Sequence, residues 1–276
     1  MRPSEGLGSI EVPVRDFSYD SGASGPKSTR AVAVEAPVQI VIGAAPFAVM
    51  MATPQDLEDF ACGFALTEQI AETVKDIRGV EVERADDGWK VKIAVSSERL
   101  QAHLARGRAM SGRTGCGLCG IEDFSQMPAP RALHPQAPIA PAAIRAALAD
   151  LETRQPLNQL TRAVHAAAWC ARDGTIVLVR EDVGRHNALD KAIGALAQAG
   201  VAPDSGFFVI TSRCSFEMVA KAAIFGAGTL VAVSAPTSLA LERAQRFGVR
   251  LIAVARRDQA LCFDGGENEA SGGLAA

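Results

Sequence analysis

Several features that define common protein classes are missing from this chain. It has no run of about 18 uncharged apolar residues, which a membrane-spanning helix requires. Its first residues contain no apolar stretch of the kind that secretory signals carry. With 28 basic and 31 acidic residues, and a formal net charge of −3, it lacks the positive excess of broad nucleic-acid binders. We therefore expect a cytoplasmic protein that binds neither membrane nor nucleic acid.

The composition is typical of a globular protein. Hydrophobic residues make up 48% of the 276 residues and charged residues 21%, which suffices for one large domain or two smaller ones. Residues 1–30 and 264–276 are rich in glycine, serine and charge, and are predicted to be mobile tails. The proline-rich stretch 127–141 is predicted to link an N-terminal α+β domain, 31–126, to a C-terminal domain, 142–263.

The N-terminal domain is predicted to contain four strands and one helix. A helix is expected from about Pro54 to Ile70, with Thr53 as its N-terminal cap and acidic residues in its first turn. Apolar runs bounded by turn residues predict the strands. These strands are expected at 38–43, 46–52, 77–83 and 89–95.

In the C-terminal domain, predicted strands and helices alternate. Such alternation is typical of an α/β fold whose mixed sheet lies between helices. Gly200 is expected to end the first of these helices. The strands are expected at 163–170, 175–180, 207–211, 229–234, 250–255 and near 260–263, and the helices at 187–199, 215–225 and 237–247.

The six cysteines fall into two groups. Four are isolated, and we expect them to be free, buried thiols: Cys62, Cys170, Cys214 and Cys262. The other two, Cys116 and Cys119, lie in the segment SGRTGCGLCG, within a glycine-rich loop predicted at 107–125. Glycines permit close approach of another molecule, and nearby arginines favour the thiolate, which is the reactive form: Arg106, Arg108 and Arg113.

The Cys116/Cys119 spacing fits three kinds of chemistry. It could supply half of a zinc site, although a second close pair of ligands is absent from the sequence. It could be a thioredoxin-like redox pair, although no helical pattern follows it. It could also carry sulfur as a persulfide on one cysteine. The spacing alone does not choose among the three.

Two strand-to-helix junctions are candidates for anion binding. The strand at 207–211 is followed by Ser212 and Arg213, and the strand at 229–234 by a serine- and threonine-containing turn. A helix N-terminus offers free N–H groups, and arginine can bind phosphate through two donors. Two such junctions on neighbouring strands would form a crevice for a phosphorylated ligand. The alternative is that these hydroxyl side chains only cap helices.

The segment EDVGRHNALDKAIG, at 181–194, is the densest polar cluster. It is either a solvated loop with Asn187 as a helix cap, or it turns Arg185 and His186 toward the same crevice to bind phosphate or a base. His165, on a predicted strand, is interpreted as a core or edge residue. Trp89 and Trp169 are interpreted as packing residues.

These segments together resemble the formate dehydrogenase accessory sulfurtransferase family, FdhD. The resemblance covers most of residues 36–263. It implies a C-terminal domain similar to the cytidine-deaminase fold, but without deaminase chemistry, because the zinc signature H-x-E with P-C-x-x-C is missing. The matching segments are PFAVMMATPQDLEDFACGFALTEQI (46–70), TGCGLCG (114–120), EDVGRHNALDKAIG (181–194), TSRCSFEMVAKAAIFG (211–226) and SAPTSLALERAQRFGVRLIAVAR (234–256).

The resemblance also implies a function. By this resemblance, the protein is expected to move sulfur from a cysteine desulfurase to the bis(molybdopterin guanine dinucleotide) molybdenum cofactor of formate dehydrogenase. It is also expected to be a homodimer with no permanently bound metal. Cys116 would carry the persulfide and Cys119 would assist. A chaperone that binds the cofactor without relaying sulfur is the alternative, and a zinc-bound module is another. By the same resemblance, the cofactor site would include Val254, Ala255, Arg256, Arg257, Asp258 and Gln259. The family typically has an aromatic-x-Arg-x-Gly-Arg pattern there, of which this chain retains only Arg256.

Overall fold

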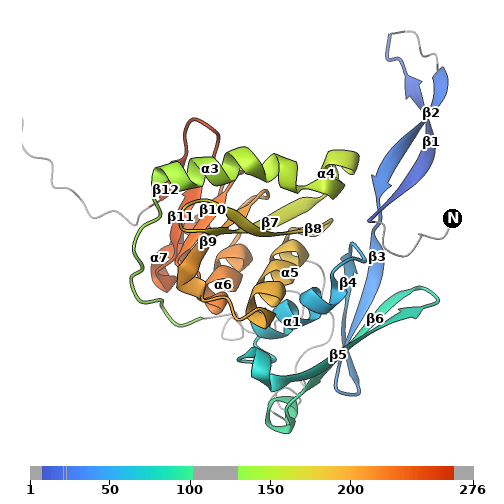
Figure 1. Cartoon of the computed structure of the whole chain (residues 1–276). Helices are drawn as coiled ribbons and strands as arrows, with labels where there is room; N and C mark the ends of the chain where they lie inside the picture. The colour runs from blue at the N-terminus through green and yellow to red at the C-terminus, as the bar shows by residue number, and fades with distance from the viewer. Residues whose placement is uncertain (1–7, 21, 23, 102–129, 264–276) are drawn as a thin grey trace, which may run out of the picture.

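The computed structural model describes residues 8–20, 22, 24–101 and 130–263 (Figure 1). Within these ranges the chain forms a six-stranded sheet in the order β12-β11-β10-β9-β7-β8, a four-stranded sheet in the order β4-β3-β6-β5, and a two-stranded sheet, β1-β2. Helices pack on both faces of the larger sheet (Figure 1). The mixed α/β fold class is thereby confirmed, while the likeness to cytidine deaminases stays a prediction.

The smaller sheet carries the four strands expected in the N-terminal part. β3 pairs with β4 in antiparallel and with β6 in parallel orientation, and β5 pairs antiparallel with β6. Gly43, with a φ of 61°, lies in the turn between β3 and β4, where a residue with a Cβ would be strained. The bounds are β3 Ala36–Ile42, β4 Ala45–Ala52, α1 Leu57–Thr67, β5 Ile77–Ala85 and β6 Gly88–Val95.

The larger sheet places its parallel strands so that their carboxyl ends share one edge. β9, β10 and β11 are parallel, and β8 runs the same way because both β8 and β9 pair antiparallel with β7. Helices α5, α6 and α7 follow β8, β9 and β10, so they all begin at that edge. The bounds are β7 His165–Ala171, β8 Ile176–Asp182, α5 Arg185–Gln198, β9 Gly206–Ile210, α6 Phe216–Phe225, β10 Thr229–Ala232, α7 Ser238–Phe247, β11 Arg250–Ala253 and β12 Leu261–Phe263.

Two helices that the sequence analysis did not predict, α3 (Pro141–Leu151) and α4 (Pro156–Thr161), lie on the opposite face of the larger sheet from α5, α6 and α7 (Figure 1). The two faces bury separate apolar clusters, one including α1, α5, α6 and α7, and the other including α3. Trp169 is fully buried and makes edge-to-face contacts with Phe208 and Phe225, while Trp89 packs at the margin of the first cluster. Both tryptophans are packing residues, as expected.

The N-terminal segment corrects one expectation. We expected a mobile tail over residues 1–30, but β1 (Ser9–Phe17) and β2 (Ser24–Ala33) form an antiparallel hairpin that projects from the body of the molecule (Figure 1). Ile10, Val12 and Val14 alternate with more exposed residues along β1, which is the pattern of a strand. The abundance of glycine, serine and proline in the segment concealed that alternation.

The described part of the predicted linker contains neither helix nor strand between residues 130 and 140, and Pro141 begins α3. A proline suits the first turn of a helix because its missing N–H has no partner there in any case. The domain boundaries themselves stay a prediction. Among the residues that the structure describes, no helix is both long and apolar enough to cross a membrane.

Candidate functional site

The carboxyl edge of the larger sheet brings most of the predicted site residues together. Arg185 and His186 follow β8, Ser212 and Arg213 follow β9, and the turn 254–259 follows β11. Crevices at the carboxyl ends of parallel strands are the usual ligand sites of open α/β sheets. The strand order therefore brings to one edge of the sheet residues that lie far apart in the sequence.

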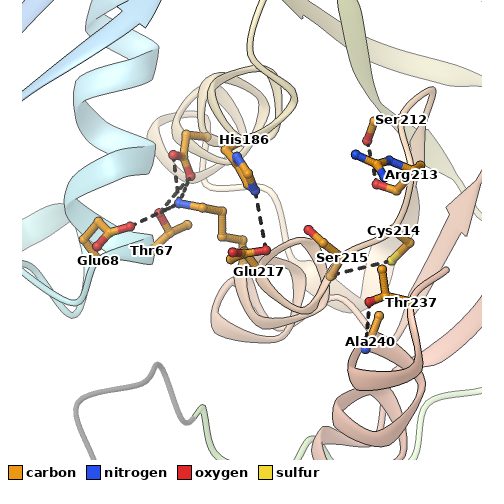
Figure 2. Close-up of polar contacts among 12 residues, drawn as sticks. Thr67, Glu68, His186, Ser212, Arg213, Cys214, Ser215, Glu217, Thr237 and Ala240 are labelled. Carbon is orange, nitrogen blue, oxygen red and sulfur yellow. Dashed lines mark hydrogen bonds and ion pairs between the residues drawn. The ribbon is translucent and has the colours of Figure 1, made fainter. Parts of the chain in front are cut away.

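The junctions after β9 and β10 are joined directly. The Cys214 amide donates to the Ala235 carbonyl at 3.1 Å, and the Thr237 amide donates to the Cys214 carbonyl at 3.0 Å. Thr237 caps α7, because its side chain accepts from the Ala240 amide at 3.3 Å (Figure 2). Ser215, at the start of α6, makes no such capping bond. The capping interpretation is thus confirmed for α7 and wrong for α6, whose first N–H groups remain candidates for an anion.

Arg213 is exposed beside this junction, whereas Ser212 is buried and its hydroxyl donates to the Arg213 carbonyl at 3.0 Å (Figure 2). The arginine can therefore reach a ligand, since its side chain extends into solvent at the helix end. Ser212 instead holds the backbone of the junction. Of these two predicted residues, the geometry favours direct contact by Arg213 only.

The turn after β11 is tightly closed. The Arg256 amide donates to the Gln259 carbonyl at 2.8 Å, and the Val254 amide donates to the Ser234 carbonyl at 3.2 Å. Val254 has a φ of 53°, which is strained for a β-branched residue. The Arg256 guanidinium folds back to donate to the Val233 carbonyl and to the Ala255 carbonyl. Ala255 is buried, while the side chains of Arg256, Arg257, Asp258 and Gln259 are exposed.

His186 lies in the first turn of α5 and faces Glu217 in the first turn of α6, with 3.6 Å between Nε2 and Oε2 (Figure 2). That distance exceeds a hydrogen bond, so the attraction is mainly electrostatic. Burial alone would raise the pKa of Glu217, but the contacts of its carboxylate with His186 and Ser215 outweigh burial and lower that pKa to about 2. Glu217, which the sequence analysis did not identify, is thus a fixed negative charge between the first turns of α5 and α6.

One turn deeper, the same two helices form a second cross-helix pair. Lys221 Nζ contacts both carboxylate oxygens of Asp190 at 2.9 Å, the Thr67 hydroxyl at 2.8 Å and Glu68 Oε1 at 3.5 Å (Figure 2). Burial disfavours the ammonium, but Asp190 and Glu68 outweigh it and raise the pKa of Lys221. Thr67 and Glu68 lie at the end of α1, so this cluster ties the N-terminal helix to α5 and α6.

A third buried cluster joins β4 to α5. Lys191 Nζ lies 2.7 Å from Asp182 Oδ2, and both side chains are fully buried. Lys191 also donates to the Thr53 carbonyl at 2.9 Å, and the Thr53 amide donates to Asp182 at 3.0 Å. The prediction that Thr53 caps the following helix is wrong: α1 begins at Leu57, and Thr53 is instead a partner of this ion pair.

The interpretation of 181–194 as a solvated loop is therefore wrong. Asn187 does not cap α5, which begins after Gly184; its side-chain amide donates to the Met51 carbonyl at 2.8 Å and to Asp182 at 3.0 Å. The charged residues of the segment are buried because partners far away in the sequence meet them. Within residues 181–194, only Val183, Gly184 and Arg185 are partly exposed, at the start of the helix.

His165 reaches the same edge from β7, which runs antiparallel to β9. Burial lowers the pKa of its imidazole, and electrostatic interaction with Arg185, His186 and Arg213 lowers it further. This side chain, interpreted from the sequence as a core or edge residue, is partly exposed and lies among the predicted site residues. Nothing in the sequence signals this position, because it depends on the antiparallel pairing of β7 with β9.

The cysteines divide differently from what we expected. Burial raises the pKa of Cys62 to about 11 and those of Cys170 and Cys214 to about 12, so none of these three forms a thiolate readily. Cys262 is exposed, against our expectation, because β12 is an edge strand. Cys116 and Cys119, with Arg106, Arg108 and Arg113, lie outside the described residues.

Comparisons with known proteins extend over nearly the whole chain. The model of the FdhD/NarQ family matches residues 33–269. A sulfur carrier protein FdhD from Xanthomonas euvesicatoria is 49% identical over 226 residues, which cover 82% of this chain and 80% of that protein. A sulfur carrier protein FdhD from Cupriavidus necator is 47% identical, covering 82% and 78%.

A solved structure supports the fold independently. A crystal structure from Desulfotalea psychrophila, described provisionally as a formate dehydrogenase accessory protein, matches with a TM-score of 0.71 and 24% identity, covering 95% of this chain and 99% of that one. At this identity the match speaks for the fold alone. The family model and the curated relatives, by contrast, cover most of the sequence, and on their evidence the chain belongs to the FdhD/NarQ family.

Proposed function

We propose that this protein is a sulfur carrier in the maturation of a formate dehydrogenase, and that it acts as a sulfurtransferase through a persulfide on Cys116. The observation that carries the proposal is its similarity, over more than four fifths of its length, to proteins named as sulfur carriers. The CxxC pair at 116 and 119 supplies the chemistry, since a thiolate is the nucleophile in sulfur exchange. Three of the four described cysteines are unsuited to that role because burial keeps them protonated.

In the first step, the Cys116 thiolate attacks the terminal sulfur of a persulfide on a cysteine desulfurase. A new S–S bond forms on Cys116, the S–S bond of the donor breaks, and the donor leaves as a thiolate. No net oxidation or reduction occurs. Arginines upstream of the pair favour the attacking thiolate if they lie nearby: Arg106, Arg108 and Arg113.

In the second step, Cys119 assists release. Its thiolate attacks the inner sulfur of the Cys116 persulfide, a Cys116–Cys119 disulfide forms, and hydrosulfide leaves with the electron pair of the broken bond. The hydrosulfide is then available as a ligand for molybdenum in the acceptor, the bis(molybdopterin guanine dinucleotide) cofactor. A cellular thiol reductant restores the dithiol by two exchange steps.

The acceptor would bind at the carboxyl edge of the larger sheet. Its pyrophosphates suit the exposed Arg213 guanidinium and the uncapped start of α6, and Arg185 lies at the start of the neighbouring helix. His186 would border the same site, and the Ser212 hydroxyl would hold the backbone of the junction after β9. The turn 254–259 would supply Arg256 and Arg257, while Asp258 could accept from guanine N–H groups. A homodimer is part of the proposal because the cofactor carries two nucleotides.

The experiment is sulfur loading followed by intact-mass measurement. The protein is incubated with a cysteine desulfurase and cysteine, and we expect a gain of one sulfur atom in the wild type and none in Cys116→Ala. Cys262→Ala, which removes the exposed cysteine of β12, is the matched control and should load like the wild type. A cofactor chaperone without relay chemistry is the alternative, and it would bind the cofactor while the wild type gains no sulfur.

A further inference from the structure

A cavity of about 340 Å³, the α1 cavity, lies at the start of α1 against strands β5 and β6 of the smaller sheet. It shares no residue with the cofactor site of the proposed function. The start of α1 lines it with three carboxylates, from Asp56, Glu58 and Asp59, and the sheet lines it with Val82 and the indole of Trp89. The dipole of α1 favours acidic residues in the first turn, but it does not account for the aromatic wall beside them.

The three carboxylates of the α1 cavity are only partly paired. Two nitrogens of Arg180, on β8, lie 2.9 Å and 2.7 Å from Asp59 Oδ2. The Nε atom of the same arginine is 3.6 Å from Asp56 Oδ2, a distance that exceeds a hydrogen bond. Glu58 is exposed, and its carboxylate has neither a hydrogen bond nor an ion pair within the part of the chain that the structure describes. Two negative charges are therefore available to a cation.

Two arginines of the chain itself indicate which cation these walls bind. Arg180 pairs with Asp59 through two nitrogens, and the guanidinium carbon of Arg84 lies over the Trp89 ring, 5.3 Å from its centre. Neither arginine lines the cavity, so both approach from outside it. A guanidinium combines stacking on an aromatic ring with paired bonds to a carboxylate, which an ammonium matches less well. The walls of the cavity therefore suit a third guanidinium.

A metal ion or a large ligand fits the cavity less well. Val82 and the Trp89 indole offer a metal no ligand atom, and in the described ranges no group of three or more histidine, cysteine or acidic side chains could hold one. The cavity is also at the lower end of the range of small-molecule sites, which is about 300–1,000 Å³. It therefore matches a single long side chain.

The surface around the cavity is acidic. Residues 53–101 include 11 acidic and six basic residues, a larger negative excess than the net charge of −3 of the whole chain. Such an excess attracts a basic protein surface and speeds its docking. In the proposed function the acceptor docks at the carboxyl edge of the larger sheet, and the persulfide donor must also dock on this protein. The acidic face is left to the donor, so the donor is the partner that we assign to it.

We propose that the α1 cavity receives an arginine side chain of the protein that donates sulfur, with its guanidinium between the Trp89 indole and the Glu58 and Asp56 carboxylates. The inference rests on the proposed function, because it assigns a docking point to the first of its two steps. The contact is non-covalent and leaves the exchange at Cys116 as described. Its loss should change how much donor is needed rather than what the donor does.

The first test observes the indole N–H signals of the isotope-labelled full chain by NMR. The chain has two tryptophans, and Trp169 is buried, so its signal serves as the internal reference. Titration with N-acetyl-arginine amide should move the Trp89 signal, whereas the citrulline analogue, which has a similar shape and no charge, should not. Glu58→Gln should weaken the arginine titration about threefold. Glu81→Gln, which removes an exposed carboxylate of the same sheet outside the cavity, is the control.

The second test measures the initial rate of sulfur loading as a function of the concentration of the cysteine desulfurase. Glu58→Gln should raise the half-saturating donor concentration about threefold, and the double variant with Asp56→Asn about tenfold, because each exposed contact contributes modestly. Added salt should raise that concentration more in the wild type than in the double variant. Asparagine tolerates the φ of 52° at position 56, so the backbone there is retained.

The opposite results are equally specific. An unchanged half-saturating donor concentration in the double variant would overturn the proposal, and dissociation of a homodimer in that variant would then assign the cavity to a second copy of the chain. A Trp89 signal that responds equally to arginine and citrulline would overturn it as well. Failure of the proposed function looks different, because the wild type would gain no sulfur at any donor concentration while Trp89 still responds to arginine. That pair of results would exclude the donor as the occupant.

Discussion

The two faces of one sheet edge hold their charged residues in different ways. On the α5/α6 face, the charged residues pair with one another in buried clusters, as Lys191 does with Asp182 and Lys221 with Asp190. On the α4 face, Gln155 Oε1 has no hydrogen-bond partner among the described residues, and the Glu152 carboxylate makes only exposed, long contacts with Arg162 and Arg257. The first arrangement fixes the geometry of the helix starts, whereas the second contributes little to stability because its charges remain in water. The difference shows that the charges of a dense polar cluster in a sequence can fix the positions of helices.

The largest effect should come from breaking a buried pair on the α5/α6 face. Lys191→Met leaves the Asp182 carboxylate buried without its ion partner, and we expect a loss of about 3–5 kcal/mol in the free energy of unfolding. Urea unfolding followed by circular dichroism measures it. Lys92→Met, which removes an exposed lysine paired with Glu81 and Glu83, is the control and should cost less than about 1 kcal/mol. Equal losses in the two variants would contradict the contrast.

The Glu217 carboxylate should make this face sensitive to acid. Its pKa is lowered in the folded protein from 4.5 to about 2, so its stabilisation is complete above about pH 4.5 and is lost as the pH falls toward 2. We expect Glu217→Gln to lose about 2–3 kcal/mol at pH 7 and to show a flatter stability profile between pH 5 and 2. Urea midpoints across that range provide the measurement. A parallel offset of the two profiles at every pH would argue against the assigned charge.

The crossing of α1 and α5 should be nearly as sensitive. A Cβ on Gly63 would overlap the Asp190 carbonyl, and one on Gly194 would overlap the Asp59 carbonyl. Because backbone atoms cannot yield cheaply, we expect Gly63→Ala to cost about 1–3 kcal/mol. Gly79→Ala is the matched control, since a Cβ there meets nothing within 4 Å. Thermal and urea unfolding of both variants compare them, and a neutral Gly63→Ala would mean that the helices can separate.

The smallest effect should be on the α4 face. Gln155→Leu removes one hydrogen bond to the Leu151 carbonyl, but it also removes a buried acceptor with no partner. These two changes oppose each other, so we expect a change of less than about 1 kcal/mol in unfolding free energy. Urea unfolding of the free protein checks this. A loss comparable to that of Lys191→Met would show that both faces are structural.

The sequence predicted the elements well and the partners of the charged residues poorly. Gly200, Gly226 and Gly248 do lie just beyond α5, α6 and α7, because helix ends depend on local backbone conformation. The burial of Asp190 depends instead on Thr67 and Lys221, which only the fold brings to it. In the same way, Thr53 looked like a cap, and nothing nearby in the chain revealed Lys191 as its partner.

The site shows the same division. The helix starts and Arg213 could be located from strand-to-helix alternation, since parallel strands must end at one edge. The α4 face could not, because α3 and α4 were not predicted and Gln155 and Arg162 carry no motif. His165 belonged to a predicted strand, but its neighbours depended on an antiparallel pairing that the sequence leaves open. Local patterns therefore predicted the helix starts at the sheet edge, while the opposite face became known only from the structure.

Helix α5 carries two consecutive charges whose counterions come from different directions. Consecutive helical residues point about 100° apart, so Asp190 can be directed at α6 while Lys191 is directed at β8 and β4. A rotation or a one-residue slide of this helix would break both attractions at once. The axial position and the rotation of α5 are therefore fixed by electrostatics as well as by packing. The same constraint sets the direction in which Arg185 and His186 leave its first turn.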